Sequence, residues 1–201
     1  MTLPTLAAPE VWLFGDIETT GIVPTAPNAT ILELGLLAVE VPSFREVDAW
    51  SSVVVAPGRA NDVLAGADDY VRNMHTQSGL KSELEAALKS WAMGGEIPDL
   101  ASVQAKAIQF FLKHCAGRKA YLGGANPAFD QTWLRVHMPQ LIGKFHYRPF
   151  DTNAFFQLRE ALLGPAEKTN QRHRVLDDCR QAVKVVHEHF DLMAQMFGGK
   201  K

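Results

Sequence analysis

The pattern of hydrophobic and polar positions divides the chain into an initial strand-rich part and a longer helical part. Residues 11–17, 30–40 and 48–55 are continuously apolar or alternate with a period of two, and each segment is bounded by Pro, Gly, Asn or Asp. These three segments are predicted to be strands. The first connection contains two prolines and an asparagine, which favours a loop over a helix. The start of the chain is therefore predicted to form an antiparallel meander.

Helical spacing of apolar residues dominates the rest of the chain. One helix is predicted to begin at Ser82, where Glu85 completes a capping-box pattern, and to end at Gly94. Further helices are predicted over residues 100–114, 129–137, 151–163 and 176–197. A short strand is predicted over residues 119–123. A strand meander followed by helices and a further strand indicates an α/β fold with a mixed sheet.

Length and composition are those of one globular domain. The 201 residues favour a single domain over 1–201, with residues 1–9 and 198–201 expected to be flexible. The net charge of −2 argues against a protein that coats duplex nucleic acid, and it fits a short substrate better than a long one. No apolar run reaches the roughly 20 residues of a membrane span. The N-terminus has no signal-peptide pattern, so we expect a cytoplasmic protein whose Cys115 and Cys179 are free thiols.

Two carboxylates one residue apart, Asp16 and Glu18, stand at the end of the first predicted strand. Side chains at i and i+2 of a strand point to the same face of a sheet, so both charges are aimed at one place. Like charges held together beside an apolar core are costly unless a cation neutralises them. The pair therefore indicates a divalent-metal site rather than a device for solubility.

Three later residues are candidates to complete this site. Asp130 follows Asn126 at the start of a predicted helix, where an acid taken alone has an ordinary capping role. Asp178 lies in the first turn of the last predicted helix. His173 precedes it by five residues, and such residues do not share a helix face. His173 is therefore expected on the loop before the helix, where it and Asp178 can point at one centre.

Together these residues form D-x-E, then N-x-x-F-D, then H-x-x-x-x-D, in order along the chain. This arrangement resembles the histidine-bearing (DEDDh) branch of the DEDD exonuclease superfamily. The resemblance implies a ribonuclease H-like fold, with a mixed five-stranded sheet flanked by helices. It also implies a metal-dependent 3′–5′ exonuclease, in which Asp16, Glu18, Asp130 and Asp178 hold two Mg²⁺ or Mn²⁺ ions and His173 is the general base.

Further segments resemble one family within this branch, the oligoribonucleases, and the likeness covers nearly the whole chain. Residues 74–80 are similar to the HTxSGL segment of that family, residues 137–151 to its MPEL…FHYRYLD stretch, and residues 173–178 to its H-x-A-L-D-D. These segments are not shared by DEDDh enzymes in general. The resemblance implies hydrolysis of short single-stranded oligoribonucleotides, down to dinucleotides, to nucleoside 5′-monophosphates.

The same resemblance implies a set of substrate contacts. Ile22 and Tyr70 would wedge and stack against the terminal bases, and His75 would line the substrate pocket. Arg148 would meet the far phosphate, and Tyr147 would reach into the partner's site, because oligoribonucleases are homodimers. Two further residues, Thr19 and Asn126, belong to the expected substrate-binding set. Read from the residues alone, Tyr70 is equally well explained as a partly buried core residue.

Departures from the family pattern leave the substrate open. Thr19 stands where oligoribonucleases have Met, so residues 16–21 read like those of proofreading and RNase T-like exonucleases. Asn153 replaces a phosphate-capping Ser, and Pro149 interrupts the HYRY pattern. One alternative is therefore a broader exonuclease that acts on single-stranded DNA or RNA. The other is a catalytically silent module that binds nucleic acid.

Some conspicuous residues are given a structural interpretation. The four tryptophans are expected in the core because they stand in apolar contexts: Trp12, Trp50, Trp91 and Trp133. His187, Glu188 and His189 are expected on a solvated helix face, because successive helix residues point in different directions.

Overall fold

The computed structural model describes residues 10–59, 61–118, 120–164 and 173–198. Its centre is a five-stranded sheet in the order β3-β2-β1-β4-β5. The strands are β1 (Glu10–Thr19), β2 (Ile31–Val41), β3 (Arg45–Val53), β4 (Leu122–Gly124) and β5 (Phe150–Asp151). The first three are antiparallel, whereas β4 is parallel to β1 and β5 is parallel to β4. The predicted meander and mixed five-stranded sheet are thus confirmed.

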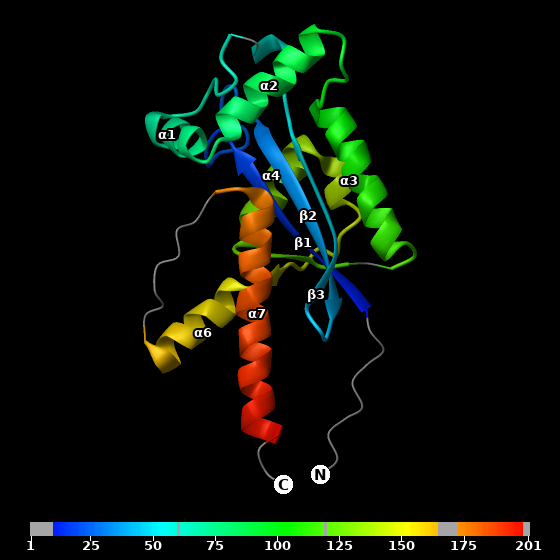
Figure 1. Ribbon diagram of the computed structural model, residues 1–201, viewed down its shortest axis with the longest axis vertical. Helices are drawn as coiled ribbons and strands as arrows, with labels where there is room; N and C mark the ends of the chain where they lie inside the picture. Colours follow the sequence, from blue (N-terminus) through cyan, green and yellow to red (C-terminus); the bar gives the residue numbers. More distant parts are fainter. Residues whose placement is uncertain (1–9, 60, 119, 165–172, 199–201) are drawn as a thin grey trace.

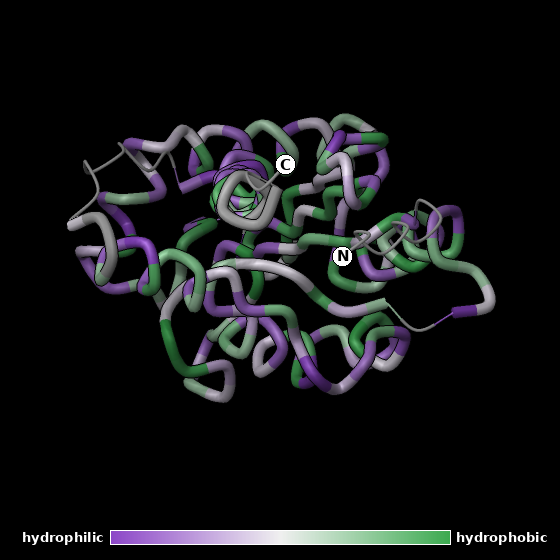
Figure 2. The backbone as a smooth tube through the Cα atoms, turned by 90° about the horizontal axis from the view of Figure 1, so that it is seen from below, coloured by the Kyte–Doolittle hydropathy of each residue, from purple (hydrophilic) through white to green (hydrophobic). Residues whose placement is uncertain are grey.

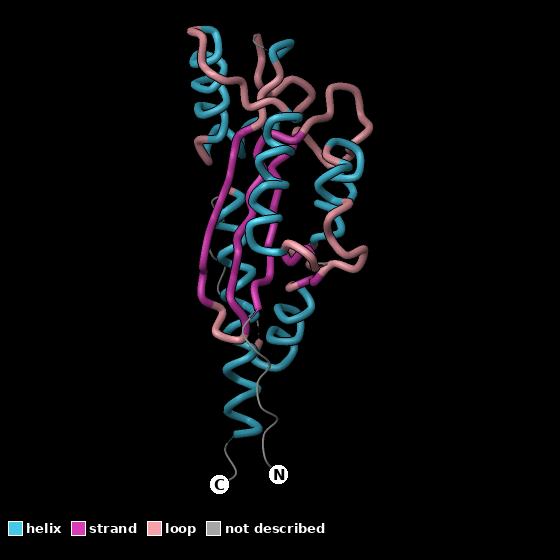
Figure 3. Tube along the Cα trace, turned by 90° about the vertical axis from the view of Figure 1, so that its right-hand side faces the viewer, coloured by secondary structure: helices cyan, strands magenta, loops and turns pink. Residues whose placement is uncertain are grey.

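Helices cover this sheet (Figures 1 and 3). They are α1 (Asp69–Gln77), α2 (Leu80–Ala92), α3 (Leu100–Cys115), α4 (Pro127–His137), α5 (Pro139–Ile142), α6 (Asn153–Leu163) and α7 (Val175–Gly198), with a 3₁₀ turn at Pro57–Arg59. Hydrophobic and hydrophilic positions alternate along their traces (Figure 2), as expected for helices with one buried face. No helix in the described part of the chain is both long and apolar enough for a bilayer.

Alternation along β1 separates two apolar layers. Leu13 and Ile17 pack in the layer formed with α3 and α4. Phe14 packs on the opposite face, together with Cys179 of α7. Asp16 and Glu18 have the same parity as Phe14, so the strand directs both acids to the face that α7 covers. The fold therefore places the start of α7 near the acidic end of β1.

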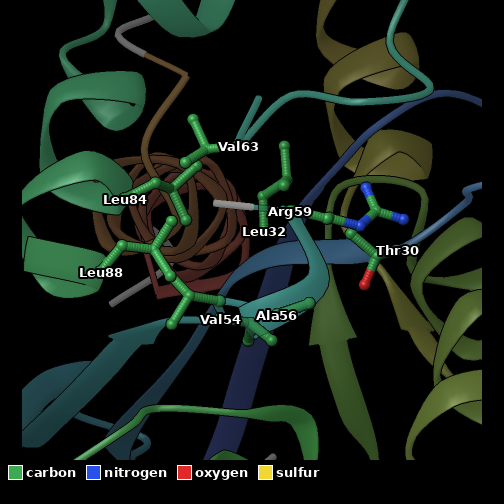
Figure 4. Close-up of a pocket in the computed structure, with 9 residues that line it drawn as sticks. Thr30, Leu32, Val54, Ala56, Arg59, Val63, Leu84 and Leu88 are labelled. Carbon is green, nitrogen blue, oxygen red and sulfur yellow. The ribbon is translucent and has the colours of Figure 1, made fainter. Parts of the chain in front are cut away.

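Helix α2 packs on a separate apolar cluster at the end of the sheet (Figure 4). Its buried stripe consists of Leu80, Leu84 and Leu88. The helix begins at Leu80 after Gly79, whose φ of 83° is left-handed, so the prediction that Ser82 is the N-cap was wrong. Burial of Leu80 extends the helix upstream of the capping-box pattern. The stripe borders a cavity of about 10 Å³, room for roughly one water molecule.

Several expectations about single residues are corrected. Trp91 is 38% exposed, although Trp133 is completely buried as expected. His189 is buried: its Nδ1 donates to the Val185 carbonyl 2.7 Å away, and its ring meets Phe155 edge to face. Long amphipathic helices expose or bury residues according to what packs on them, which spacing alone does not reveal.

Other predictions concern elements and thiols. Helices α1 and α5 and strand β5 were not predicted; α5 and β5 span only four and two residues. Cys115 and Cys179 are buried free thiols, as expected. The segments 1–9 and 199–201, which were expected to be flexible, lie outside the described residues, whereas Gly198 ends α7.

Candidate active site

The acidic end of β1 is closely paired on one side and open on the other. Along β2, Asp16 lies opposite Gly35 and Glu18 lies opposite Glu33. On the other side, β4 pairs only with Leu13 and Phe14. The short β4 strand therefore leaves the edge of β1 free beside the two acids, and another element can reach them there.

Asp130 occupies this free edge. It is 3% exposed and lies in the first turn of α4, after Asn126 and Pro127. Its Oδ1 accepts the backbone N–H of Ile17 at 3.1 Å, between the two β1 acids. The helix N-cap is Asn126, so the carboxylate of Asp130 is directed to the strand and is more than a helix cap. Three carboxylates consequently meet at the end of β1.

The start of α7 brings the remaining two predicted residues. Asp178 lies in its first turn, and its N–H donates to the carbonyl of Arg174 at 3.0 Å. His173 precedes the helix with a left-handed φ of 49°, on the loop as predicted. One possible ligand atom from each of Glu18, His173 and Asp178 lies within 4.8 Å of the others. The structure thus brings His173 and Asp178 to the acids of β1.

Burial, with the repulsion between neighbouring carboxylates, raises the pKa values of these acids. Burial, followed by the charges of Asp178 and Glu33, raises the pKa of Glu18 to about 9. Burial raises the pKa of Asp130 to about 7, against the lowering effect of its backbone hydrogen bonds. Burial and the neighbouring Asp130 raise the pKa of Asp16 well above its ordinary value. Burial also raises the pKa of Asp178. A cation bound among these carboxylates would favour their ionised form.

An arginine ion-pair cluster, consisting of Arg174, Glu33 and Glu83, adjoins the acids and was missed by the sequence analysis. Arg174 follows His173 and donates to Glu33 of β2 at 2.9 and 3.1 Å. It also donates to Glu83 of α2 at 2.8 Å through each of two nitrogens. The available signal was Glu33, an acid inside a continuously apolar strand that needs a partner.

His75 does not line an open pocket, which corrects the expectation. It is completely buried, and its Nε2 lies 2.9 Å from the carbonyl of Thr19 and donates to it. Its Nδ1 is 3.8 Å from Glu18 and has no hydrogen-bond partner. Burial lowers the pKa of His75, which favours the neutral imidazole. His75 therefore stabilises the end of β1 through its hydrogen bond to Thr19.

A cavity of about 730 Å³ opens between α1 and the start of α7. It is lined by Tyr70, Asn73, Met74, Gln77, Ser78, His173, Arg174 and Asp177. Tyr70 is 74% exposed, so the alternative of a core tyrosine was wrong. Ile22, in the loop after β1, is 83% exposed. Both side chains are available for contact with a ligand.

The other predicted substrate contacts lie in different settings. The Thr19 hydroxyl donates to the Gly21 carbonyl at 2.6 Å, so it is engaged within its own turn. The exposed Asn126 donates its backbone N–H to Asp151 at 3.2 Å. Tyr147 is 68% exposed, and the Arg148 guanidinium lies 5.3 Å from the centre of its ring. Tyr147 and Arg148 are not among the residues lining the cavity.

The fold and the ordered set of acids match those of the DEDDh 3′–5′ exonuclease superfamily. No family model matches the sequence. The chain is 29% identical over 181 residues to an oligoribonuclease of Leifsonia xyli subsp. xyli, covering 87% of this chain and 78% of the relative. It is 24% identical over 184 residues to an oligoribonuclease of Pseudomonas aeruginosa, covering 90% and 93%.

Solved structures have the same fold. The nuclease domain of 3′hExo, a DEDDh family member bound to rAMP, matches with a TM-score of 0.59 and 14% identity over 90% of this chain and 92% of that one. Cell-death related nuclease 4 matches with a TM-score of 0.60 and 12% identity, over 91% and 64%. A complex of Escherichia coli exonuclease I with single-stranded DNA matches with 0.59 and 12%, over 95% and 41%. The predicted ribonuclease H-like fold is confirmed.

Proposed function

We propose that this protein is a two-metal-dependent 3′–5′ exonuclease that hydrolyses short single-stranded oligoribonucleotides, down to dinucleotides, to nucleoside 5′-monophosphates. The observation that carries the proposal is the meeting of two acids of β1 with one acid each from α4 and α7, next to His173. These acids stand beside a cavity that His173 shares with the exposed Tyr70. The proposed catalytic residues thus adjoin a cavity that could hold a terminal nucleotide.

The residues present fit divalent cations. The raised pKa values of Glu18 and Asp130, caused chiefly by burial, indicate that a bound cation would stabilise both acids as anions. Carboxylate oxygens are the ligands that Mg²⁺ and Mn²⁺ prefer, and we assign Asp16, Glu18, Asp130 and Asp178 to hold two such ions. When bound, the two ions would supply an activated water and shield the charge of the phosphate and the leaving oxygen.

His173 is suited to take the proton of the attacking water. An imidazole changes its charge near neutral pH, so it can accept a proton and pass it on within one turnover. Its ring stands beside Glu18 and Asp178, at the opening of the cavity. We therefore assign His173 as the general base.

The cavity supports a short substrate. Tyr70 offers an exposed ring, and stacking of a base on such a ring contributes roughly 1–3 kcal/mol without regard to sequence. Asn73, Gln77 and Ser78 add amide and hydroxyl groups for a sugar or base edge. Its volume of about 730 Å³ is in the range of a small-molecule site. The relatives named above are oligoribonucleases, which supports RNA of this length.

Residues outside the cavity complete the proposal. We assign Ile22 as the wedge between the terminal bases, and we expect Arg148 to bind the far phosphate. Tyr147 would reach the site of the second protomer in a cytoplasmic homodimer. Exposure of all three side chains is consistent with these roles. In a mass measurement in solution, we expect twice the mass of one chain.

A broader exonuclease for single-stranded DNA or RNA is the second candidate. It is favoured by Thr19, whose hydroxyl is engaged with Gly21 where oligoribonucleases are expected to have Met. A silent binding module has little support, because so many uncompensated acids would destabilise a site without metal.

The experiment measures product release from 5′-labelled RNAs of two, seven and twenty nucleotides, and from DNA of the same lengths. We expect hydrolysis with Mn²⁺ or Mg²⁺, none with chelator, and the highest rate on the dinucleotide. Asp178→Ala is expected to abolish hydrolysis while its thermal unfolding stays within a few degrees of wild type. Full activity of that variant would contradict the two-metal site. Equal rates on all lengths and on DNA would favour the second candidate.

A further inference from the structure

We propose that Arg174 is a positioning residue of the hydrolytic site: through its ion pairs with Glu33 and Glu83 it holds His173 and the first turn of α7 against the acids of β1. This inference rests on the proposed function for its kinetic consequence. Its structural part, the placement of the His173 ring, is testable without any reaction.

The ion pairs of Arg174 join three elements. Nε and Nη2 donate to the two oxygens of Glu33 on β2, at 3.1 and 2.9 Å. Nη1 and Nη2 donate to the two oxygens of Glu83 on α2, each at 2.8 Å. Both pairs are therefore bidentate, which restricts orientation as well as distance. The arginine at the start of α7 is thus fixed to the sheet and to α2.

The donor count argues against a direct role in binding phosphate. A guanidinium has five N–H groups, and the four hydrogen bonds to Glu33 and Glu83 leave about one. Its single positive charge is also shared between two carboxylates. An arginine occupied in this way offers little to an anion, although it borders the cavity. Its contribution must then pass through its neighbours.

The nearest neighbour is His173, whose backbone needs support. Its φ of 49° is left-handed, a conformation that costs a non-glycine residue roughly 1 kcal/mol or more. Such a conformation persists when the surrounding contacts determine it. Arg174 supplies those contacts on the C-terminal side of His173. Without them, we expect the imidazole to move away from Glu18 and Asp178.

The next residue, Val175, is a second anchor that fixes the start of α7 to the sheet. Val175 is completely buried, and a Cβ placed on Gly35 of β2 would come within 2.6 Å of its side chain. The N–H of Asp178 then donates to the Arg174 carbonyl. The short segment from His173 to Asp178 therefore carries the base, the two anchors and the last acid, and the anchors fix the position of this segment over β2.

Arg180 provides a matched control. It is on the same helix and makes a bidentate pair with Glu46 at 3.0 Å for both bonds, but it does not line the cavity. The experiment measures kcat and KM on a dinucleotide for wild type, R174A, R174K, E83A and R180A. Thermal unfolding of each variant shows whether it is folded. If R174A fails to fold, E83A tests the same ion pair from an exposed partner.

We expect R174A to lower kcat about 10- to 100-fold with KM changed by less than about threefold, because displacement of a reacting group by about 1 Å has an effect of that size. R174K keeps the charge without the planar fork and should stay within about threefold of R174A. E83A should lower kcat about 3- to 10-fold, since one of the two pairs remains. R180A should be within about twofold of wild type.

A double-mutant cycle separates positioning from a general loss of structure. If Arg174 acts through His173, then R174A in the H173A background changes kcat by less than about twofold. In metal-free protein, the His173 imidazole resonance should shift or broaden in R174A but not in R180A.

These measurements also separate failure of the inference from failure of the proposed function. Multiplying losses in the double variant, a rise of KM alone, or an unchanged His173 resonance would overturn the inference. An inactive wild type would overturn the proposed function, and the resonance would still decide whether Arg174 places His173.

Discussion

Glu18 and Glu33 are opposite each other on neighbouring strands and are buried to nearly the same extent, at 7% and 2% exposed, yet their surroundings differ completely. Glu33 has both oxygens on Arg174. Glu18 makes no ion pair with an arginine among the described residues; the Nδ1 of His75 lies 3.8 Å away, and burial, followed by the charges of Asp178 and Glu33, raises the pKa of Glu18 to about 9. A buried acid is thus no sign of function by itself.

The two acids differ in whether a positively charged side chain balances the carboxylate. A buried carboxylate with an arginine on both oxygens is a satisfied structural element, which orients what is attached to it. A buried carboxylate surrounded by Asp16, Asp130 and Asp178 is unstable as an anion until a cation arrives. The same strand pair thus provides support on β2 and proposed chemistry on β1.

The largest expected effect comes from Glu18→Gln. Loss of one ligand oxygen at the proposed metal site should reduce the hydrolysis rate by about a thousandfold or more. Stability without metal should not fall and should exceed that of wild type near neutral pH, because folded Glu18 must take up a proton that Gln does not need. The measurement is the single-turnover rate on a dinucleotide, together with thermal unfolding in chelator.

Glu33→Gln is the counterpart at the opposite position. It leaves Arg174 short of one charged partner, so it should lower the free energy of unfolding by about 1–3 kcal/mol. Activity should remain within about tenfold of wild type. If Glu33→Gln abolished activity and Glu18→Gln only lowered stability, the assignment of the two acids would be reversed.

Divalent ions should have the next largest effect, an increase in thermal stability. This increase should depend on the acids proposed to bind metal and not on Glu33. An ion at about 100 times its Kd stabilises the folded state by about 2.7 kcal/mol. For a chain of this size, that is about 5–10 °C in Tm. We expect Mn²⁺ to raise the Tm of wild type and of R180A by this amount, measured by calorimetry. An equal rise in Glu18→Gln would place the ion elsewhere.

The pH dependence of stability tests the same acids in the absence of metal. The pKa of Glu18 rises from 4.5 to about 9 on folding, and that of Asp130 from 3.8 to about 7. The folded state therefore retains protons that the unfolded chain has released, so this stability is present below about pH 4 and is lost as pH rises to about 9. In chelator, the Tm of wild type should fall relative to Glu18→Gln between pH 5 and 9. A flat difference would contradict the raised pKa values.

The strengths and errors of sequence reasoning have identifiable causes. The capping-box pattern at Ser82 misplaced the start of α2 because burial of Leu80 outweighed it. Trp91 was placed in the core by its apolar neighbours, but it lies at the end of α2, where nothing covers it fully. His75 was expected to line the pocket, yet packing encloses it beneath β1. These errors all concern the burial of a residue by parts of the chain distant in sequence, which the local sequence pattern does not reveal.

The sequence by itself determined the strands, the main helices and the direction of Asp16 and Glu18, because a spacing of two on a strand puts side chains on one face whatever surrounds them. The tertiary structure alone decided that Asp130 reaches the N–H of Ile17 and that Arg174 finds its acids 141 and 91 residues away. Such contacts depend on sheet register and helix packing. The short β4 leaves one edge of β1 free for Asp130, and the pairing of β1 with β2 puts Glu33 opposite Glu18. Of these two acids, Glu33 is the one that Arg174 binds through both carboxylate oxygens.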